Sequence, residues 1–231
     1  IKHIVRLIVN SRSYRQASTA APELLIRDPE NRIVTRQGRF RLPAELVRDS
    51  ALSISGLLSL DVGGPSVKPY QPENYWENLN FPQRTYQADS GTSQFRRGLY
   101  TWWQRSFVHP SMLAFDAPTR EECTADRTQS NIPQQALVLL NDPTYVEAAR
   151  AFASRIVAEG GGDASSRIAW AFENATSRAP SSGESTLLAK LYESSLVQYQ
   201  ADPAAASSLL KVGQSSVAID EGKTVELATW V

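Results

Sequence analysis

Three strong helix starts follow one another in the second half of the chain, and they restrict its fold more than any other feature. Asp142-Pro143 and Asp202-Pro203 each combine an N-cap acid with a proline at the first helical position. Ser181 and Glu184 have the spacing of a capping box. Apolar residues recur at helical intervals after these starts. The pattern predicts helices over residues 133–140, 143–159 and 164–177, another after the capping box, and a last one over residues 204–212.

The first 130 residues have weaker and more interrupted patterns. Pro43 opens a helix that we expect to continue to Leu58, with Glu45 and Arg48 spaced for a local ion pair. Residues 61–95 have the composition of a loop with five interleaved aromatic residues, and residues 96–105 favour a short helix. Residues 1–10 predict a packing helix, whose apolar face consists of Ile1, Ile4, Val5 and Ile8.

These elements predict a mainly α fold with little or no β-sheet. We expect an irregular, loop-rich helical portion (residues 1–130) to pack on a more regular helical portion (residues 131–231) within a single domain, 1–231. The chain begins without Met inside a helical pattern and ends on an apolar pattern without a stop signal. We therefore expect it to be a fragment of a longer polypeptide.

The charge balance argues against a nucleic-acid binder or a polybasic membrane binder, because 24 basic residues face 24 acidic ones. The charge is nevertheless uneven along the chain: residues 1–130 carry a net charge of +4 and residues 131–231 a net charge of −4. Of the 17 basic residues in the first part, 15 are Arg. Two interpretations remain open: Arg side chains that hold loops together internally, or an anion-facing surface.

Several kinds of chemistry are excluded or disfavoured by residue counts. A single cysteine, Cys123, forms no intrachain disulfide, no cysteine-rich zinc site and no c-type haem attachment. Acidic neighbours disfavour a thiolate at Cys123, so we expect a buried structural thiol. His109 is more consistent with a hydrogen-bonded core histidine than with a catalytic base. No phosphate-binding loop, no nucleophile elbow and no membrane-spanning apolar run occurs.

The candidate ligand-binding residues are the aromatic and arginine side chains of the first portion. Aromatic faces flanked by Arg suit a polysaccharide, although core packing is the more common use of such rings. The acids near residue 120 suit either a carboxylate pair for glycoside hydrolysis or salt bridges to Arg120 and Arg127. We assign no catalytic and no metal-binding residue. The candidate ligand-binding set is Arg96, Arg97, Trp102, Trp103, Arg105, Arg120, Asp116, Tyr70 and Trp76.

Consecutive motifs along the chain resemble a planctomycete-specific domain, domain-of-unknown-function family 1553. The resemblance is dense up to about residue 150 and weaker beyond it, where a turn at Arg178-x-Pro180 with Glu184 continues it. The motif blocks are Asp28–Arg32, Arg39–Leu42, Glu45–Asp49, Gly63–Pro72, Arg96–Arg105, Phe115–Glu121, Asn131–Leu137 and Leu140–Pro143.

The resemblance implies a setting rather than a reaction. In this family the domain usually forms the C-terminal part of large exported proteins and follows a cytochrome-like domain. This implies a periplasmic or cell-surface location, upstream cytochrome-like domains as partners, and haem c in a separate domain, with no cofactor in this chain. The resulting hypothesis is a non-catalytic helical module that supports redox-domain assembly or partner docking. The alternative is a carbohydrate-directed module that binds or hydrolyses an anionic polysaccharide.

Overall fold

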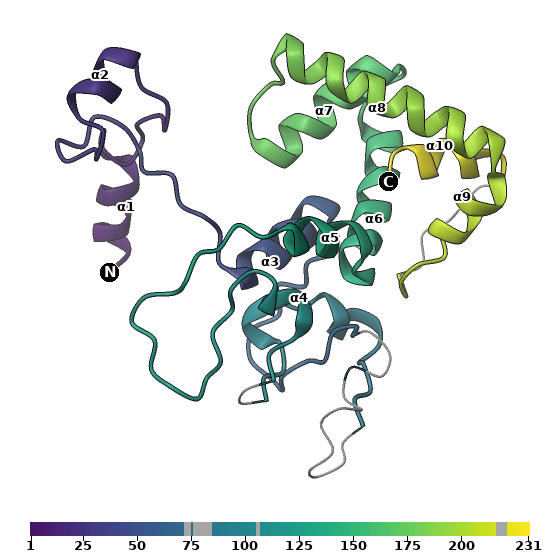
Figure 1. Cartoon of the computed structure of the whole chain (residues 1–231), viewed down its shortest axis with the longest axis horizontal. Helices are drawn as coiled ribbons and strands as arrows, with labels where there is room; N and C mark the ends of the chain where they lie inside the picture. Colours follow the sequence, from purple (N-terminus) through teal and green to yellow (C-terminus); the bar gives the residue numbers. More distant parts are fainter. Residues whose placement is uncertain (72–74, 76–84, 105–106, 216–220) are drawn as a thin grey trace. The chain divides into compact units, whose positions relative to one another are not determined.

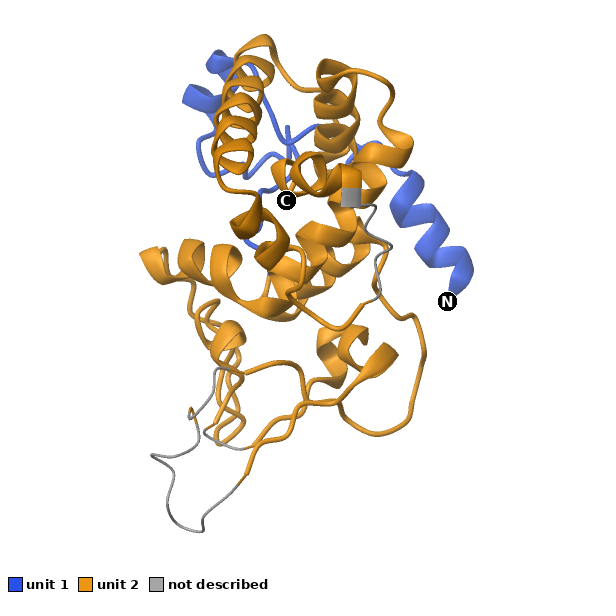
Figure 2. Ribbon diagram, turned by 90° about the vertical axis from the view of Figure 1, so that its right-hand side faces the viewer, with its two compact units in different colours: residues 1–42 blue, residues 43–231 orange. Residues whose placement is uncertain are grey.

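The computed structural model describes residues 1–71, 75, 85–104, 107–215 and 221–231, and its regular elements are helices (Figure 1). Within these residues the β-type pairings are isolated bridges, such as the one between Val67 and Thr101. The predicted mainly α fold is therefore confirmed. The chain divides into two compact units, residues 1–42 and residues 43–231 (Figure 2). That the two form a single domain stays a prediction.

Unit 1 contains helix α1 (Lys2–Asn10), helix α2 (Pro22–Arg27) and a loop held by its own polar side chains. The Asp28 carboxylate accepts hydrogen bonds from the backbone N–H groups of Arg32 and Ile33, at 2.8 and 2.9 Å. Asn31 Oδ1 accepts from the N–H groups of Thr35 and Arg36. The helix predicted at the start of the chain is present, but none of its residues is buried within the described part of the chain.

The core of unit 2 begins where helix α3 (Ala44–Ser55) packs against helix α6 (Pro143–Glu159). Leu52 of α3 and Ala148 of α6 share this cluster with Phe95, which ends the short 3₁₀ helix η1 (Gly91–Phe95). A second cluster joins Ala44 to Val108 and to Met112 of helix α4 (Pro110–Leu113). Helix α5 (Pro133–Asn141) contacts α6.

The remaining helices pack around the second half of α6. They are α7 (Ala164–Thr176), α8 (Ser182–Ala201), α9 (Pro203–Leu209), the 3₁₀ turn η3 (Glu221–Lys223) and α10 (Thr224–Thr229). Their shared core contains Ala153, Ala206, Leu210, Leu227 and Ala228. No helix in the described part of the chain has the length and apolar character needed to cross a membrane.

The three predicted helix starts are confirmed by their caps. Asp142 accepts a hydrogen bond from the N–H of Thr144 at 2.9 Å, and Asp202 accepts one from the N–H of Ala205 at 3.0 Å. Ser181 and Glu184 form the reciprocal capping box. These caps are local interactions, which is why the sequence alone identified them.

Three local predictions in the first portion are wrong. Helix α3 ends at Ser55 rather than Leu58, because Gly56 takes a left-handed conformation with φ +80°. Residues 98–100 form the 3₁₀ turn η2 (Gly98–Tyr100) in place of a longer helix. The chain then pairs with Val67, whose N–H donates to the Tyr100 carbonyl at 2.8 Å. Glu45 and Arg48 do not pair with each other, because both have distant partners described below.

Candidate functional site

Two buried guanidinium groups organise the arginine-rich part of unit 2. Arg48, only 2% exposed, donates through Nη1 to the Arg96 carbonyl at 2.6 Å and through Nη2 to the Gln94 carbonyl. Burial away from water lowers the pKa of this guanidinium below its ordinary value. Arg96, 8% exposed, donates to the Pro65 carbonyl at 2.7 Å and to the Gly63 carbonyl. Both side chains therefore hold backbone carbonyls that have no regular secondary structure to satisfy them.

The aromatic rings of this region are covered by cations from the same chain. The guanidinium carbon of Arg96 lies 3.9 Å from the ring centroid of Tyr100, and that of Arg97 lies 5.7 Å from it. Lys68 Nζ lies 4.9 Å from the Trp102 ring. These contacts stabilise the folded loops, and they occupy ring faces that a sugar would need for stacking.

One further pair lies at the surface. The guanidinium carbon of Arg120 lies 4.1 Å from the ring centroid of Trp103. Arg120 is exposed, and Trp103 Nε1 is a buried donor without an acceptor among the described residues. Among the predicted ligand-binding residues that the structure describes, this pair combines an exposed cation with an indole donor that has no acceptor.

The salt bridges to Arg120 and Arg127, one of the two interpretations of the acids near residue 120, do not form among the described residues. Arg127 forms a two-pronged contact with Glu45, at 2.7 and 3.2 Å. Although partial burial opposes the charge of Glu45, the hydrogen bond from Arg127 keeps the pKa of this carboxyl below its usual value. Asp116 accepts from the N–H and from Oγ of Ser130, each at 2.7 Å. Asp116 therefore positions the loop that leads to α5.

Within the described part of the chain, the predicted aromatic and arginine site residues contact separate partners. Arg96 and Arg97 contact Tyr100, Trp102 contacts Lys68 and Tyr86, and Trp103 contacts Arg120. Trp76 and Arg105 lie outside the described residues. Ligand binding by this set stays a prediction.

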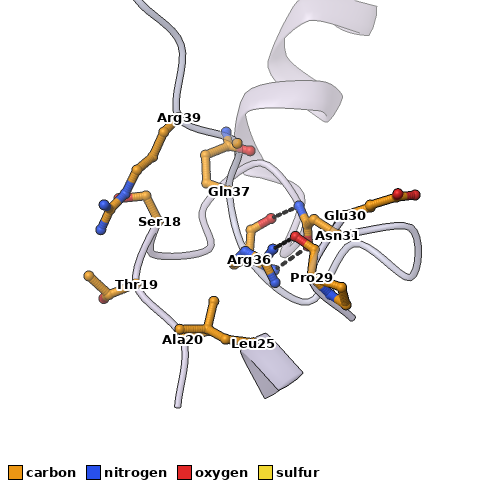
Figure 3. A pocket seen from close by; sticks show the side chains of 11 residues that line it. Ser18, Thr19, Ala20, Leu25, Pro29, Glu30, Asn31, Arg36, Gln37 and Arg39 are labelled. Atoms are coloured by element: carbon orange, nitrogen blue, oxygen red, sulfur yellow. Dashed lines mark hydrogen bonds between the residues drawn. The ribbon is translucent and has the colours of Figure 1, made fainter. Parts of the chain in front are cut away.

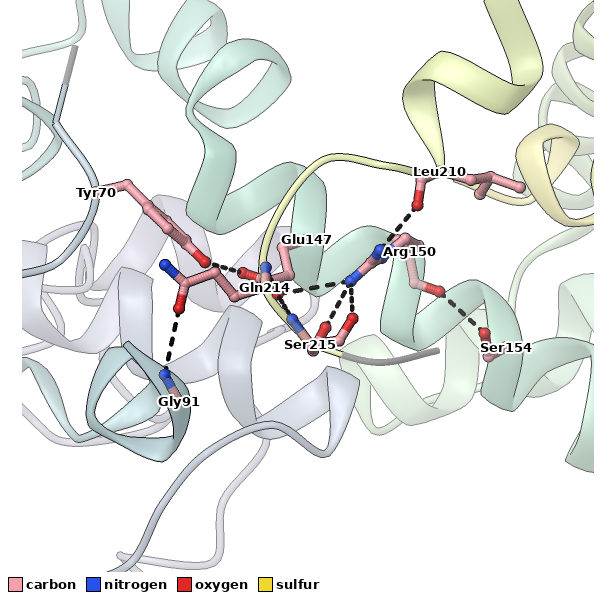
Figure 4. A network of polar contacts seen from close by, with 8 residues as sticks. All are labelled: Tyr70, Gly91, Glu147, Arg150, Ser154, Leu210, Gln214 and Ser215. Atoms are coloured by element: carbon pink, nitrogen blue, oxygen red, sulfur yellow. Dashed lines mark hydrogen bonds and ion pairs between the residues drawn. The ribbon is translucent and has the colours of Figure 1, made fainter. Parts of the chain in front are cut away.

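Sequence reasoning missed a buried polar network around α6 (Figure 4). The fully buried Glu147 accepts from the N–H groups of Gln214 (2.7 Å) and Ser215, and from the Tyr70 hydroxyl at 3.0 Å. Arg150 Nη2 lies 3.5 Å from the Glu147 carboxylate, while its other contacts are the Leu210 carbonyl and Ser215. The i, i+3 spacing of Glu147 and Arg150 was a usable signal.

Tyr70 joins this network to the buried His109. The Tyr70 carbonyl contacts His109 Nε2, and Ser111 Oγ lies 2.8 Å from His109 Nδ1. Burial lowers the pKa of His109 to about 4, so the ring is neutral at pH 7, with Nε2–H donating and Nδ1 accepting. Both ring nitrogens are used internally, which confirms a core histidine. The Tyr70 hydroxyl has a raised pKa because of burial and the nearby Glu147 carboxylate.

Unit 1 contains a polar cavity of about 390 Å³ (Figure 3). On one side Arg36 donates to the carbonyls of Asp28 and Pro29, at 2.9 and 2.6 Å, and Asn31 donates to the Arg36 carbonyl. The exposed Arg39 lies on another side. The hydrogen bonds of Arg36 and Asn31 that border the cavity are made within this loop. We therefore assign them a role in the loop's folding and propose no ligand for the cavity.

A larger cavity of about 460 Å³ lies among α6, α7, α8 and α10 in unit 2. Its walls are mostly apolar, and we call it the apolar groove. Trp230 lines it, and its ring centroid lies 4.5 Å from that of Tyr192. Trp230 Nε1 is a buried donor without an acceptor among the described residues. The groove is lined by Phe152, Ile156, Ile168, Ala171, Phe172, Ala175, Leu188, Leu191, Tyr192, Ser195, Thr229, Trp230 and Val231.

The described residues were also inspected for a metal-binding cluster and for the environment of the cysteine. No group of three or more His, Cys, Asp and Glu side chains gathers there in a way that would hold a metal ion. Cys123 is exposed, so the prediction of a buried thiol is wrong. The reason is local, because residues 119–128 form exposed bends and coil and not a packed helix.

One family model matches most of the chain. The family described as PSD1, protein of unknown function (DUF1553), matches residues 1–192. The comparison with curated proteins found no match, and the comparison with solved structures found none either.

Proposed function

The chain belongs to the DUF1553 family of proteins of unknown function, and on that premise we propose that it is a non-catalytic helical module that docks a neighbouring protein domain. The family resemblance suggests the setting: an exported, periplasmic or cell-surface polypeptide whose cytochrome-like part carries haem c. The module would support assembly of that redox domain. The bound haem would belong to the partner and not to this chain.

The exposed apolar surface of α5 is the observation that carries this proposal. In the described structure α5 buries only Gln135, whereas Leu137 is 58% exposed and Leu140 is 73% exposed. These two leucines are three residues apart, so they lie on one side of the helix. Contiguous exposed apolar residues on a folded protein are typical of an interaction surface. The buried guanidinium groups support the non-catalytic part of the proposal. Arg48 and Arg96 donate their hydrogen bonds to backbone carbonyls of this chain, so they stabilise its fold.

Co-purification tests the docking. The chain is co-expressed with the haem-bearing region of the same polypeptide as a separate, unlabelled chain, and haem absorbance per captured chain is measured. We expect Leu137→Asp combined with Leu140→Asp to reduce the retained haem at least tenfold. Val197→Asp is the matched control, because Val197 is 67% exposed on α8. Equal retention by the α5 variant and the control would overturn the proposal, as would turnover of a defined substrate that depends on one Asp or Glu.

A carbohydrate-directed function is the second candidate, and the Arg120–Trp103 pair favours it. An exposed guanidinium suits a sulfate or carboxylate group, and the Trp103 ring 4.1 Å below it holds that guanidinium in place. Affinity electrophoresis through gels containing a sulfated polysaccharide at low salt tests it. Retardation that is lost in Arg120→Gln but kept in Arg178→Gln would support this function. Unretarded migration of the wild-type chain would remove it.

A further inference from the structure

Helix α5 turns its apolar side away from the core of unit 2. A helix of a folded domain normally turns its apolar stripe towards the core. In α5 the buried residue is Gln135, and Val138 beside it is half-buried. The outward side consists of apolar residues, namely Ala136, Leu137 (58% exposed), Leu139 (45% exposed) and Leu140 (73% exposed).

This outward apolar side is also wide. At 3.6 residues per turn it covers about 160° of the helix circumference, from Leu139 round to Leu137. A contact with a single helix in a coiled coil needs a narrower stripe, whereas a stripe wider than about 100° is typical of a helix that packs into a core. A surface that encloses α5 therefore covers these residues better than a flat one. Amphipathic helices bind in apolar clefts of this shape.

The segment around α5 offers no charge to a partner. Residues 128–141 contain no Asp, Glu, Lys, Arg or His. Before the segment, Arg127 is paired with Glu45 at 2.7 and 3.2 Å. After it, Asp142 caps α6 by accepting from the N–H of Thr144. A charged partner group buried against α5 would therefore lose its hydration without gaining an ion pair, so an uncharged partner surface fits best.

A membrane surface fits α5 less well than a protein does. Helices that lie on a membrane are rich in Lys and Arg on their polar side, where these residues contact anionic headgroups. Residues 128–141 contain neither Lys nor Arg. The chemistry of the segment therefore favours a protein partner.

We propose that the partner of α5 presents an uncharged apolar cleft that encloses this helix. This partner chemistry rests on the docking role proposed above and specifies the surface that performs it. Burial of Leu137, Leu139 and Leu140 stabilises the complex, and ion pairs contribute nothing. The complex is therefore insensitive to salt and rejects a charge of either sign on α5.

Co-purification with the haem-bearing region tests this chemistry when the charge on α5 is varied. Leu140→Lys and Leu140→Glu should each reduce the retained haem about tenfold, because either charge would be buried without a partner. Leu140→Met keeps the volume and the apolar character, so its retention should stay within about twofold of the wild-type value. Between about 0.1 M and about 1 M salt the Debye length falls from about 10 Å to about 3 Å, yet wild-type retention should change by less than about twofold.

The outcomes separate the cleft from the docking role. If only one sign of charge reduces retention, or if high salt releases the haem-bearing region, the partner surface is charged; the cleft is then wrong, while docking through α5 stands. If Leu140→Lys and Leu140→Glu both retain as much haem as the Val197→Asp control, docking through α5 is refuted together with the cleft.

Thiol labelling of the chain alone tests whether α5 is open to a partner. The exposed Cys123 is replaced by Ser, and Leu140→Cys or Val197→Cys is added to that chain. We expect a maleimide to label both positions equally fast in the chain alone. In the complex, labelling at position 140 should slow about tenfold and labelling at position 197 should not change.

Two labelling results would overturn the proposal. Slow labelling at position 140 in the chain alone would mean that another part of this chain covers α5. Labelling at position 140 that slows on addition of phosphatidylglycerol vesicles, but not in the presence of the haem-bearing region, would assign α5 to a lipid surface.

Discussion

Replacing Gly213 with Ala should destabilise unit 2 far more than any other Gly→Ala change of similar backbone geometry. Gly213 has φ +94°, and a Cβ placed there would lie 2.2 Å from Cδ of Glu147. The left-handed conformation alone costs about 1 kcal/mol for a residue with a Cβ. The collision adds a larger penalty, because Glu147 is completely buried and three of its side-chain atoms would lie within 2.6 Å of the new Cβ.

The magnitude follows from what the displaced carboxylate loses. Its hydrogen bonds to the N–H of Gln214, the N–H of Ser215 and the Tyr70 hydroxyl would break. Separating a buried charge from its partners costs about 3–5 kcal/mol. With the backbone contribution, Gly213→Ala should lower the free energy of unfolding by roughly 4–6 kcal/mol, a large share of the 5–15 kcal/mol typical of a folded domain.

Urea unfolding followed by far-UV circular dichroism measures the effect, and two comparisons isolate its cause. Gly63→Ala is the matched control: Gly63 has φ +83°, but a Cβ there meets no atom within 4 Å, so about 1 kcal/mol should be lost. In a Glu147→Ala background the collision is absent, and Gly213→Ala should again cost only about 1 kcal/mol. Equal losses for Gly213→Ala and Gly63→Ala in the wild-type background would refute the reasoning.

Three other predictions concern stability and can be measured by the same unfolding assay. Burial lowers the pKa of His109 in the folded chain to about 4, below the usual 6.5. As the pH falls, the unfolded chain therefore binds the proton first. The stabilising contribution of the neutral His109 is fully present above about pH 6.5 and is lost as the pH falls to about 4. From pH 7 to pH 5 the wild-type chain should lose about 2 kcal/mol that His109→Gln does not lose, and identical pH profiles would contradict this. Arg48→Lys should cost about 3 kcal/mol, because an ammonium group cannot reach the Arg96 and Gln94 carbonyls together; a change below 1 kcal/mol would show that the fork is not needed. Ser181→Ala should cost about 1 kcal/mol through loss of the capping box of α8, with the exposed Ser194→Ala as control, and an equal effect of both changes would argue against the cap.

Local signals explain which parts of the fold could be predicted from the sequence. Asp142, Ser181 and Asp202 cap their helices within two or three residues, so sequence spacing contains the whole interaction. Gly56 is also a local signal, since a glycine after an apolar helical run commonly ends a helix. Our prediction passed over it in favour of the later Gly63-Gly64 pair.

Distant partners explain what could not be predicted. Arg48 bonds to carbonyls of Gln94 and Arg96, which are 46 and 48 residues away. With those partners unknown, the nearby Glu45 was the reasonable candidate for an ion pair. Glu147 is similar, because it accepts its two shortest hydrogen bonds from backbone N–H groups of the loop after α9, 67 and 68 residues away. Lys68 over Trp102 and Arg120 over Trp103 are likewise contacts between residues far apart in the sequence, so their pairing could not be read from local spacing.

Charged side chains replace secondary structure in the irregular part of this protein. A loop that is neither helix nor sheet leaves backbone groups without partners, and each buried one carries a free-energy cost. Arg48 and Arg96 together satisfy four carbonyls, while Asp49 accepts from the N–H of Gly98 and Glu147 from those of Gln214 and Ser215. Arg suits the first task because its planar fork reaches two carbonyls at once, which Lys cannot do. At Arg48 and Arg96 the choice of Arg over Lys thus has a structural cause that needs no anionic ligand.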